Sequence, residues 1–216
     1  MAHLDYSPDS KMLFVGEGNF SYSMSICITL GSGANMTVTS YDTTKDLREK
    51  YPDALANIRL LTDSGATVLH GVDARKMSEH PSLRGRTYDF IIYNFPHAGF
   101  IGDESTPAVI NKHRELVRGF FLNAVSMLSP EGQCHVTHKR KPPFNQWHIP
   151  KLASECGLGL TDCADFSIED YPGYDNKRGD GERADKRFPL GKCCKYKFVK
   201  EFGVDALCSK VSLFNT

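Results

Sequence analysis

The sequence predicts a doubly wound α/β domain, with a mostly parallel sheet of seven strands and helices on both faces. Short β-rich runs alternate along the chain with helical stretches, which is typical of parallel sheets. The run Tyr88–Tyr93 in "RTYDFIIYNFPH" is almost continuously apolar, as expected for a strand that is covered on both faces. The chain of 216 residues is long enough to bury a sizeable core.

The first half of the chain supplies four predicted strands and two helical segments. The apolar run Met12–Val15 ends in a two-glycine turn, and the following helix ends at the glycines of Gly31–Gly33. β-branched runs predict the second and third strands, and "YPD" at Tyr51–Asp53 divides the helix between them. The predicted strands are 12–15, 36–41, 67–70 and 88–93, and the predicted helices are 21–30 and 43–62.

The second half continues the alternation and ends in an antiparallel pair. Apolar residues at helical spacing predict a long helix over 107–128, and "SPEG" predicts a turn before the fifth strand. The last strand, "CCKYKFVK", is predicted to return as a hairpin with the sixth. The other predicted elements are strands 133–137 and 159–166, a helix over 146–156 and a polar loop over 169–192. We expect an extension over 1–10, one domain over 11–200 and a tail over 201–216.

Charge and cysteine usage narrow the function classes. Lysine plus arginine and aspartate plus glutamate balance at 26 each, so only local basic clusters can point to nucleic acid. No apolar stretch approaches the roughly 20 residues that span a bilayer, and "MAHLDYSPDS" is not a secretory signal. The seven cysteines are scattered, and only Cys193 and Cys194 are close. We therefore expect reduced intracellular thiols, no membrane partner and no metal.

The turn Gly16-Glu17-Gly18 follows the first strand, where ligands bind in open α/β sheets. Alone it is weak evidence, because a tight strand-to-helix turn needs no ligand. A dinucleotide site prefers G-x-G-x-x-G, but Ser21 stands at the third glycine and Glu17 would approach a pyrophosphate. S-adenosylmethionine has no phosphate and carries two cationic groups. The acid in the turn therefore favours this methyl donor.

Three further strand ends carry polar signals. The second strand ends in Asp42, close to where an acid binds a ribose in dinucleotide folds, and the third ends at Asp73-Ala74. The fourth ends in "NFPH", which resembles the N-P-P-Y signature of nitrogen-directed methyltransferases. That resemblance implies that Asn94 orients the target nitrogen by receiving its N–H, and that Phe95 or His97 stacks on the base. An ordinary loop histidine is the alternative for His97.

With "FVGEGNFSYS", "TSYD", "YDFIIYNFPHAG" and "KRKPPFNQWHIPKLASECGL", the sequence resembles the eukaryotic ribosomal RNA uridine-N3 methyltransferases and their short plant relatives, from about residue 11 to 199. The resemblance implies a class I, Rossmann-like methyltransferase that uses S-adenosylmethionine to methylate N3 of a uridine in ribosomal RNA. We expect a protein of the nucleus, nucleolus or cytoplasm that is not secreted. The implied cofactor residues are Gly16, Glu17, Gly18, Asn19, Phe20, Ser21, Asp42, Asp73, Ala74, Asn94 and Phe95. The implied substrate residues are Phe95, Pro96, His97, Lys139, Arg140, Lys141 and Trp147.

A general base is expected because the proton on uridine N3 must leave before the nitrogen attacks. His97 is the first candidate and Asp103 the second, beside Asn94 as the third catalytic residue. The target base must leave its stack, and Phe95 and Trp147 are candidates for stacking on it, although Trp147 is equally a candidate core residue.

Two basic segments are candidate RNA contacts. Lys139, Arg140 and Lys141 follow the fifth strand on the expected cofactor side. The loop with Lys177 and Arg178 either closes over the site or is a solvated charged loop, because acids interleave with its cations. Two other functions stay open, namely a methyltransferase of the same fold for a small molecule, and a cofactor-binding module without catalysis. The oligomeric state is left open.

Overall fold

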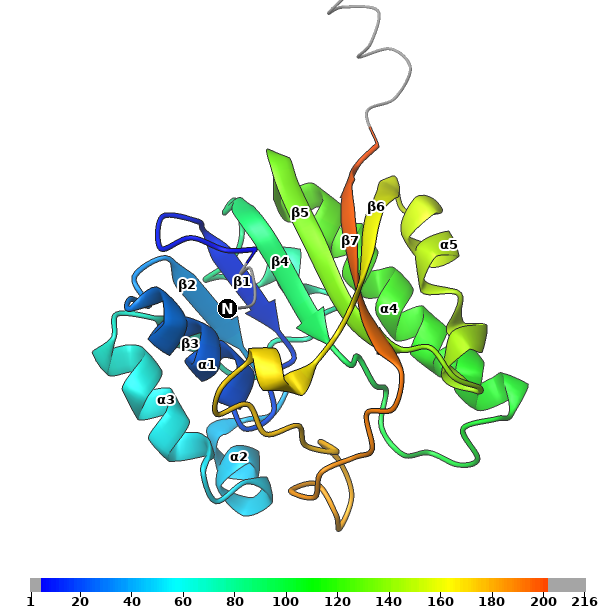
Figure 1. Ribbon diagram of the computed structural model, residues 1–216, viewed down its shortest axis with the longest axis horizontal. Coiled ribbons are helices and arrows are strands. Elements are labelled where there is room, and N and C mark those ends of the chain that lie inside the picture. Colours follow the sequence, from blue (N-terminus) through cyan, green and yellow to red (C-terminus); the bar gives the residue numbers. More distant parts are fainter. Residues whose placement is uncertain (1–4, 202–216) are drawn as a thin grey trace, which may run out of the picture.

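The computed structural model describes residues 5–201, and the predicted tail beyond residue 201 lies outside them. Seven strands form one sheet in the order β3-β2-β1-β4-β5-β7-β6, and β7 runs antiparallel to both of its neighbours (Figure 1). This confirms the predicted α/β class and the antiparallel end. The strands are β1 (Met12–Val15), β2 (Met36–Thr39), β3 (Thr67–Leu69), β4 (Tyr88–Asn94), β5 (Leu128–Lys139), β6 (Leu158–Asp165) and β7 (Cys193–Lys200).

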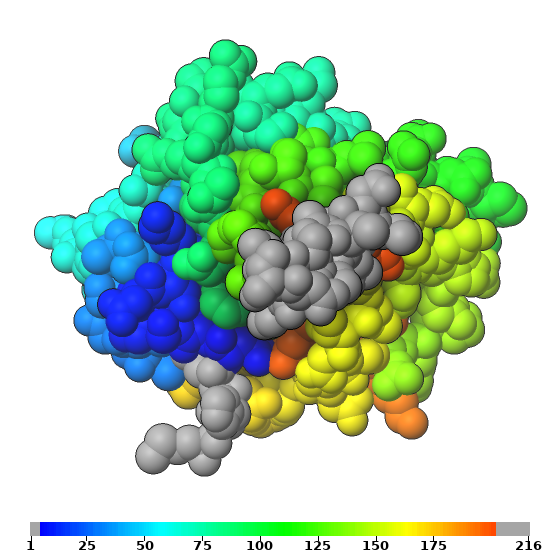
Figure 2. Space-filling view, turned by 90° about the horizontal axis from the view of Figure 1, so that it is seen from above, coloured from blue at the N-terminus to red at the C-terminus, as the bar shows by residue number. Residues whose placement is uncertain are grey.

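Helices cover both faces of the sheet (Figure 1). They are α1 (Ser21–Leu30), α2 (Thr44–Lys50), α3 (Ala54–Asp63), α4 (Pro107–Met127) and α5 (Ile149–Ser154), with short 3-10 turns η1 (Met77–Glu79), η2 (Phe144–Trp147) and η3 (Ile168–Asp170). Viewed from above, the N-terminal segments in blue and the green and yellow segments of α4, α5 and β6 form opposite sides of the molecule (Figure 2). Within residues 5–201, no helix is long and apolar enough to cross a membrane.

Alternation along β1 divides the core into two layers. Met12 and Phe14 pack with the residues of α1 and α3, whereas Leu13 and Val15 pack with those of α4 and α5. Successive side chains of a strand point to opposite faces, so one fully buried strand supplies both layers. Tyr6, from the predicted extension, is also buried and bonds His135 Nδ1 at 3.0 Å.

Two predicted elements differ from the structure. The predicted turn "SPEG" is part of β5, where Leu128 pairs with Tyr88 and Gln133 with Phe90, so the extra residues form a bulge. Asp89 accepts a hydrogen bond from the Ser129 hydroxyl across this bulge. The predicted helix over 146–156 is shorter, because α5 begins only at Ile149, just before a proline that the first helical turn tolerates.

The strand order places a crevice above the carboxyl ends of β1 and β4. The chain leaves β1 toward β2 on one side, while β4 and β5 extend the sheet on the other. The loops that follow β1 and β4 therefore run in opposite directions, and a crevice forms between them. In open α/β sheets, ligands bind in this crevice. The loop between β6 and β7 lies at this same end of the sheet, below the strands in Figure 1.

Candidate functional site: a cavity at the strand ends

A cavity of about 610 Å³ lies where β1, β2 and β4 end. It is lined by the glycine turn, by the polar residues that end the strands, and by seven residues of the β6–β7 loop. The predicted cofactor residues that line it are Gly16, Glu17, Gly18, Asn19, Asp42, Asp73, Ala74, Asn94 and Phe95. The structure therefore brings together most of the side chains that the strand-end pattern selected.

The conformation of the glycine turn depends on Gly16 and on contacts of its acid, Glu17. Gly16 has a φ of +67°, and a Cβ atom there would overlap the ring of Tyr93. The Glu17 carboxylate accepts a hydrogen bond from the Ser23 hydroxyl at 3.2 Å. Burial at the cavity wall raises the pKa of Glu17 to about 7, and the bonds from Ser23 only partly oppose this. A cationic ligand in the cavity would therefore stabilise the charged form of the Glu17 carboxylate.

Phe20 and Ser21 differ from the prediction, because neither side chain lines the cavity. Phe20 is fully buried in the core with a φ of +64°. Ser21 is buried, and its hydroxyl donates to Asn19 Oδ1 at 2.8 Å and accepts from the Asp175 backbone N–H at 2.9 Å. Both residues shape the start of α1, and Ser21 also binds the β6–β7 loop. Their role is therefore to hold the glycine turn in place and not to contact a ligand.

Both acids at the next strand ends already have cationic partners. Asp42 Oδ1 accepts from Lys50 Nζ at 2.7 Å, with both side chains largely buried. Asp73 is bound by the Arg75 guanidinium through three bonds of 2.9, 3.2 and 2.7 Å, which hold the pKa of this carboxyl below its usual range. Lys50 and Arg75 also line the cavity, although nothing in the sequence around them indicates that they pair with these acids.

The segment after β4 is held by β5. The Phe95 N–H donates to the Thr137 carbonyl at 2.8 Å, and Phe95 has a φ of +48°. Its ring meets the edges of Phe166 and Phe188 at centroid distances of 5.6 and 5.1 Å. Pro96 is buried. Phe95 and Phe188 therefore give the cavity an aromatic wall.

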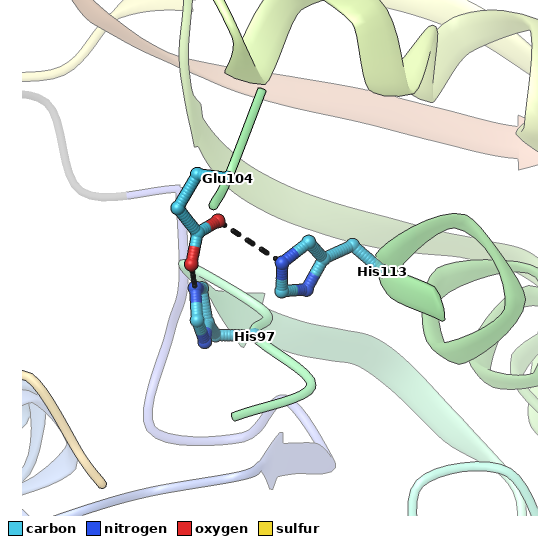
Figure 3. A group of neighbouring side chains, drawn as sticks. All are labelled: His97, Glu104 and His113. Atoms are coloured by element: carbon cyan, nitrogen blue, oxygen red, sulfur yellow. Dashed lines mark hydrogen bonds and ion pairs between the residues drawn. The ribbon is translucent and has the colours of Figure 1, made fainter. Parts of the chain in front are cut away.

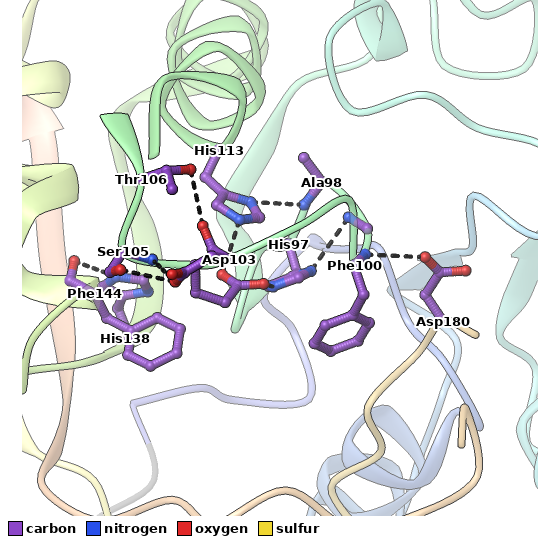
Figure 4. A network of polar contacts seen from close by, with 12 residues as sticks. His97, Ala98, Phe100, Asp103, Ser105, Thr106, His113, His138, Phe144 and Asp180 are labelled. Carbon is purple, nitrogen blue, oxygen red and sulfur yellow. Dashed lines mark hydrogen bonds and ion pairs between the residues drawn. The ribbon is translucent and has the colours of Figure 1, made fainter. Parts of the chain in front are cut away.

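His97 forms a closed network with Glu104 and His113 (Figure 3). Glu104 accepts from Nε2 of His97 at 3.2 Å and from Nε2 of His113 at 3.0 Å. The Nδ1 atoms accept backbone N–H groups, from Gly99 to His97 and from Ala98 to His113 (Figure 4). Each neutral ring therefore carries its proton on Nε2 and keeps no free lone pair.

This network contradicts the prediction that His97 is the general base. Burial and the neighbouring His113 lower the pKa of His97 to about 4, so the ring is neutral near pH 7, but both its nitrogens are already bonded. The second candidate, Asp103, is exposed, does not line the cavity, and accepts from the Ser105 N–H at 2.8 Å (Figure 4). The residue of this loop that contacts His97 is the neighbouring Glu104 and not Asp103.

The same three side chains bring their donor atoms within 4.8 Å of one another, which is close enough for a metal ion. A metal-bound histidine normally donates its other ring N–H to an acceptor. In His97 and His113 the Nδ1 atom instead faces a backbone N–H donor. Two donors would then face each other, so this arrangement fits a hydrogen-bonded network and does not fit a metal site.

The remaining predicted substrate residues lie outside the cavity wall. Trp147 is 1% exposed and stacks on His113 at 4.3 Å, so it is a core residue and not a stacking platform for a base. Lys139 lies over the Phe188 ring at 4.8 Å, beside the cavity. Arg140 pairs with Asp165 at 3.7 Å, and Lys141 is exposed.

The β6–β7 loop crosses the cavity and is bonded to both of its sides. Lys50 Nζ donates to the Gly179 carbonyl at 3.3 Å, and Asp180 accepts from the Phe100 N–H at 3.2 Å (Figure 4). The Arg178 guanidinium lies 4.3 Å from the Phe100 ring centre. The loop was expected either to close over the site or to be a solvated charged loop. Residues 174–180 close over the site.

Fold and site together define a class I, Rossmann-like methyltransferase fold. The structure of NSun6 from Pyrococcus horikoshii with SFG superposes with a TM-score of 0.60 at 16% identity, over 92% of this chain and 50% of that one. The profile of the BMT5-like family, described as rRNA (uridine-N3-)-methyltransferase BTM5-like, matches residues 13–178. The chain belongs to this family, as the sequence analysis predicted.

Similar proteins occur in plants and yeast. A heavy metal-associated isoprenylated plant protein 41 from Arabidopsis thaliana is 48% identical over 89% of this chain and 38% of its own length. An uncharacterized protein of the same plant is 46% identical over 90% of this chain and 95% of its own length. The 25S rRNA (uridine(2634)-N(3))-methyltransferase of Saccharomyces cerevisiae is 23% identical over 83% of this chain and 69% of its own length.

Proposed function

We propose that this protein transfers the methyl group of S-adenosylmethionine to N3 of uridine in ribosomal RNA. The observation that carries the proposal is that the glycine turn, Asp42, Asp73 and Asn94, which follow successive strand ends, all line the same cavity. The family supports the class of reaction. The yeast relative supports uridine N3 as the target.

The cavity suits a cationic adenosine ligand better than a phosphate-bearing one. Glu17 offers a carboxylate to the amino and sulfonium groups of the methionine part. Asp42 offers its free Oδ2 to ribose hydroxyls, since Lys50 occupies Oδ1. Asp73 and the backbone of Ala74 would meet the adenine edge. S-adenosylmethionine carries no phosphate. A phosphate-bearing ligand would be repelled by these three carboxylates.

The transfer is an in-line displacement in which positioning supplies most of the catalysis. The proton on uridine N3 passes to a water molecule. S-adenosylmethionine, which the glycine turn, Asp42 and Asp73 would hold, would supply the methyl group to this nitrogen, and its sulfur would keep the electron pair of the broken carbon–sulfur bond. Because His97 has no free lone pair, this chain's contribution is to orient the base against the aromatic wall of Phe95 and Phe188 and to exclude water around the sulfur.

RNA would approach along the rim that carries unpaired cations. Lys112 and Arg178 line the cavity, Lys139 lies beside it over the Phe188 ring, and Lys141 is exposed. Such cations bind phosphates without reading sequence. We propose a nuclear or nucleolar site of action, where ribosomal RNA is processed, and a methyltransferase domain over residues 11–200 that Tyr6 helps to close.

A small-molecule acceptor is the second candidate. It is favoured by the pairing of loop cations inside the loop, because Lys177 is bound by Asp175 at 2.9 Å and by Asp185 at 2.8 Å and is largely buried. Such a cation is not available to a phosphate chain.

The test is methyl transfer from isotopically labelled S-adenosylmethionine to an unmodified transcript of large-subunit ribosomal RNA, followed by nucleoside analysis. We expect labelled N3-methyluridine, with a rate that falls steeply as salt rises because RNA binding depends on phosphate contacts. Cofactor binding without any labelled nucleoside would reject the RNA substrate and favour the small-molecule enzyme. Failure to bind the cofactor would reject both.

A further inference from the structure

The amide of Asn94 is fixed by the next strand. Asn94 ends β4 and lies opposite Thr137 of β5 in the parallel register. The Thr137 hydroxyl donates to Asn94 Oδ1 at 2.6 Å, which is a short bond for two neutral groups. The Thr137 carbonyl also accepts the N–H of Phe95, so the same residue holds the turn and the amide.

The other end of this amide has no partner. Asn94 Nδ2 is buried and finds no acceptor among the described residues. A buried donor without an acceptor costs about 1–3 kcal/mol, so native proteins rarely keep one without a function. Asn94 lines the cavity, next to Phe95 and opposite the glycine turn. The missing acceptor is therefore one that arrives with a ligand.

The unpaired Nδ2 group determines which ligand atoms the Asn94 side chain can bind. An NH₂ group only donates, whereas the carbonyl oxygen that would receive a target N–H is already engaged by Thr137. This differs from the expectation that Asn94 receives the N–H of the target nitrogen. An exocyclic amine presented to Nδ2 would set two donors against each other. A carbonyl oxygen would complete the bond.

We propose that Asn94 is a specificity-determining residue that donates from Nδ2 to a carbonyl oxygen beside the target nitrogen, and so selects an imide nitrogen over an exocyclic amine. The inference rests on the proposed function, because it assigns a role within the same site. Loss of the N3 proton leaves negative charge on the two flanking carbonyl oxygens of uracil. A donor placed at one of them stabilises that charge, as in an oxyanion hole.

Binding without turnover gives the first test. Protein labelled with ¹⁵N and saturated with S-adenosylhomocysteine is titrated with oligouridylate and, separately, with oligoadenylate, whose bases carry no carbonyl oxygen. We expect the side-chain NH₂ resonance of Asn94 to shift downfield with oligouridylate and to stay in place with oligoadenylate. Asn94→Asp identifies the resonance by its loss. Equal shifts with both oligonucleotides would overturn the proposal.

Product analysis gives the second test, with the same ribosomal transcript and labelled cofactor. Asn94→Asp replaces the donor by an acceptor and should lower transfer to uridine by about 10²–10³-fold, the usual effect of removing one oxyanion donor. Thr137→Val keeps the donor but frees its anchor, and should lower transfer by about fivefold, as expected for one hydrogen bond. Calorimetry with S-adenosylmethionine should show that both variants still bind the cofactor, so that the loss lies in the transfer step.

The outcomes separate this inference from the function on which it rests. Label on the amino nitrogen of adenosine or cytidine in the wild type, or full transfer to uridine by Asn94→Asp, would overturn the inference while a methyltransferase remains. Absence of cofactor binding by the wild-type protein would instead overturn the proposed function. Label on uridine N3 that Asn94→Asp abolishes supports both.

Discussion

Lys50 Nζ lies 2.7 Å from Asp42 Oδ1 and 3.3 Å from the carbonyl oxygen of Gly179, so one ammonium group joins the end of β2 to the loop that crosses the cavity. Asp42 is the residue that we assign to the cofactor ribose. Lys50 therefore neutralises this carboxylate in the protein without a ligand and holds the loop at the same time.

Lys50→Met should destabilise the unliganded protein by about 1–3 kcal/mol, because a largely buried carboxylate loses its partner. Ribose hydroxyls can take over as donors, so S-adenosylmethionine should restore much of this loss. Urea unfolding with and without the cofactor measures both effects. Lys45→Met, which removes an exposed pair with Glu49, is the control and should change the stability by less than about 0.5 kcal/mol. Equal losses in the two variants would contradict the role of Lys50.

Gly16→Ala should weaken cofactor binding and destabilise the fold by about 2–4 kcal/mol, since it adds overlap with Tyr93 to backbone strain. Gly31→Ala is the matched control, because Gly31 has a similar φ of +71° but has no atom within 4 Å of the added Cβ. It should cost about 1–2 kcal/mol and leave cofactor affinity unchanged. Thermal unfolding and calorimetric titration compare the two. If Gly31→Ala weakened binding as much, the turn would not be the binding element.

Cofactor affinity should rise between pH 6 and pH 8. Burial raises the pKa of Glu17 to about 7, so the acid is mostly protonated at pH 6, and a cationic ligand must release that proton to bind. Titrations in two buffers of different ionisation enthalpy should detect proton release near pH 6.5. Without ligand, the folded state holds a proton that the unfolded chain has lost, so this group lowers stability as pH rises from 4.5 to 7. Glu17→Gln should flatten both dependences, and an unchanged pH profile in this variant would exclude Glu17.

Glu104→Gln should destabilise the protein by about 1–3 kcal/mol, because an amide can accept from only one of the two histidines. Asp103→Asn is the neighbouring control, and its exposed side chain still accepts from Ser105. Chemical unfolding of both variants measures the difference.

The rate of methyl transfer should show no inflection from His97 between pH 5.5 and 8, because its pKa lies at about 4. Between about pH 6.5 and pH 4 the protein should lose stability as pH falls, since the unfolded chain takes up a proton on His97 that the folded state resists. An inflection near pH 6.5 that disappears in His97→Gln would restore His97 as the general base.

Much of the fold was predictable because it depends on local patterns. The apolar runs of β1 and β4 and the glycines after α1 lie in consecutive residues, and the structure confirms their bounds within about two residues. The bulge in β5 was missed, because "SPEG" has the composition of a turn and only pairing with Tyr88 and Asp89 makes it a strand.

The site was predictable only as far as topology decides it. Parallel strands bring their carboxyl ends together, so Gly16, Asp42, Asp73 and Asn94 were found from the order of the strands. Lys50, the partner of Asp42, and His113, the partner of Glu104, lie on helices. No sequence pattern indicates which helical side chains point toward the site. From the sequence, Trp147 was equally a candidate for the core and for the site. Its burial and its stacking on His113 show that it is a core residue.

The most direct test of the central claim is a calorimetric titration of the purified chain with S-adenosylmethionine, beside Asp42→Ala and Gly16→Arg. The account predicts one site per chain for the wild-type protein, and loss of binding in both variants while each still unfolds cooperatively. Absence of binding by the folded wild-type chain, or undiminished binding by both variants, would contradict it.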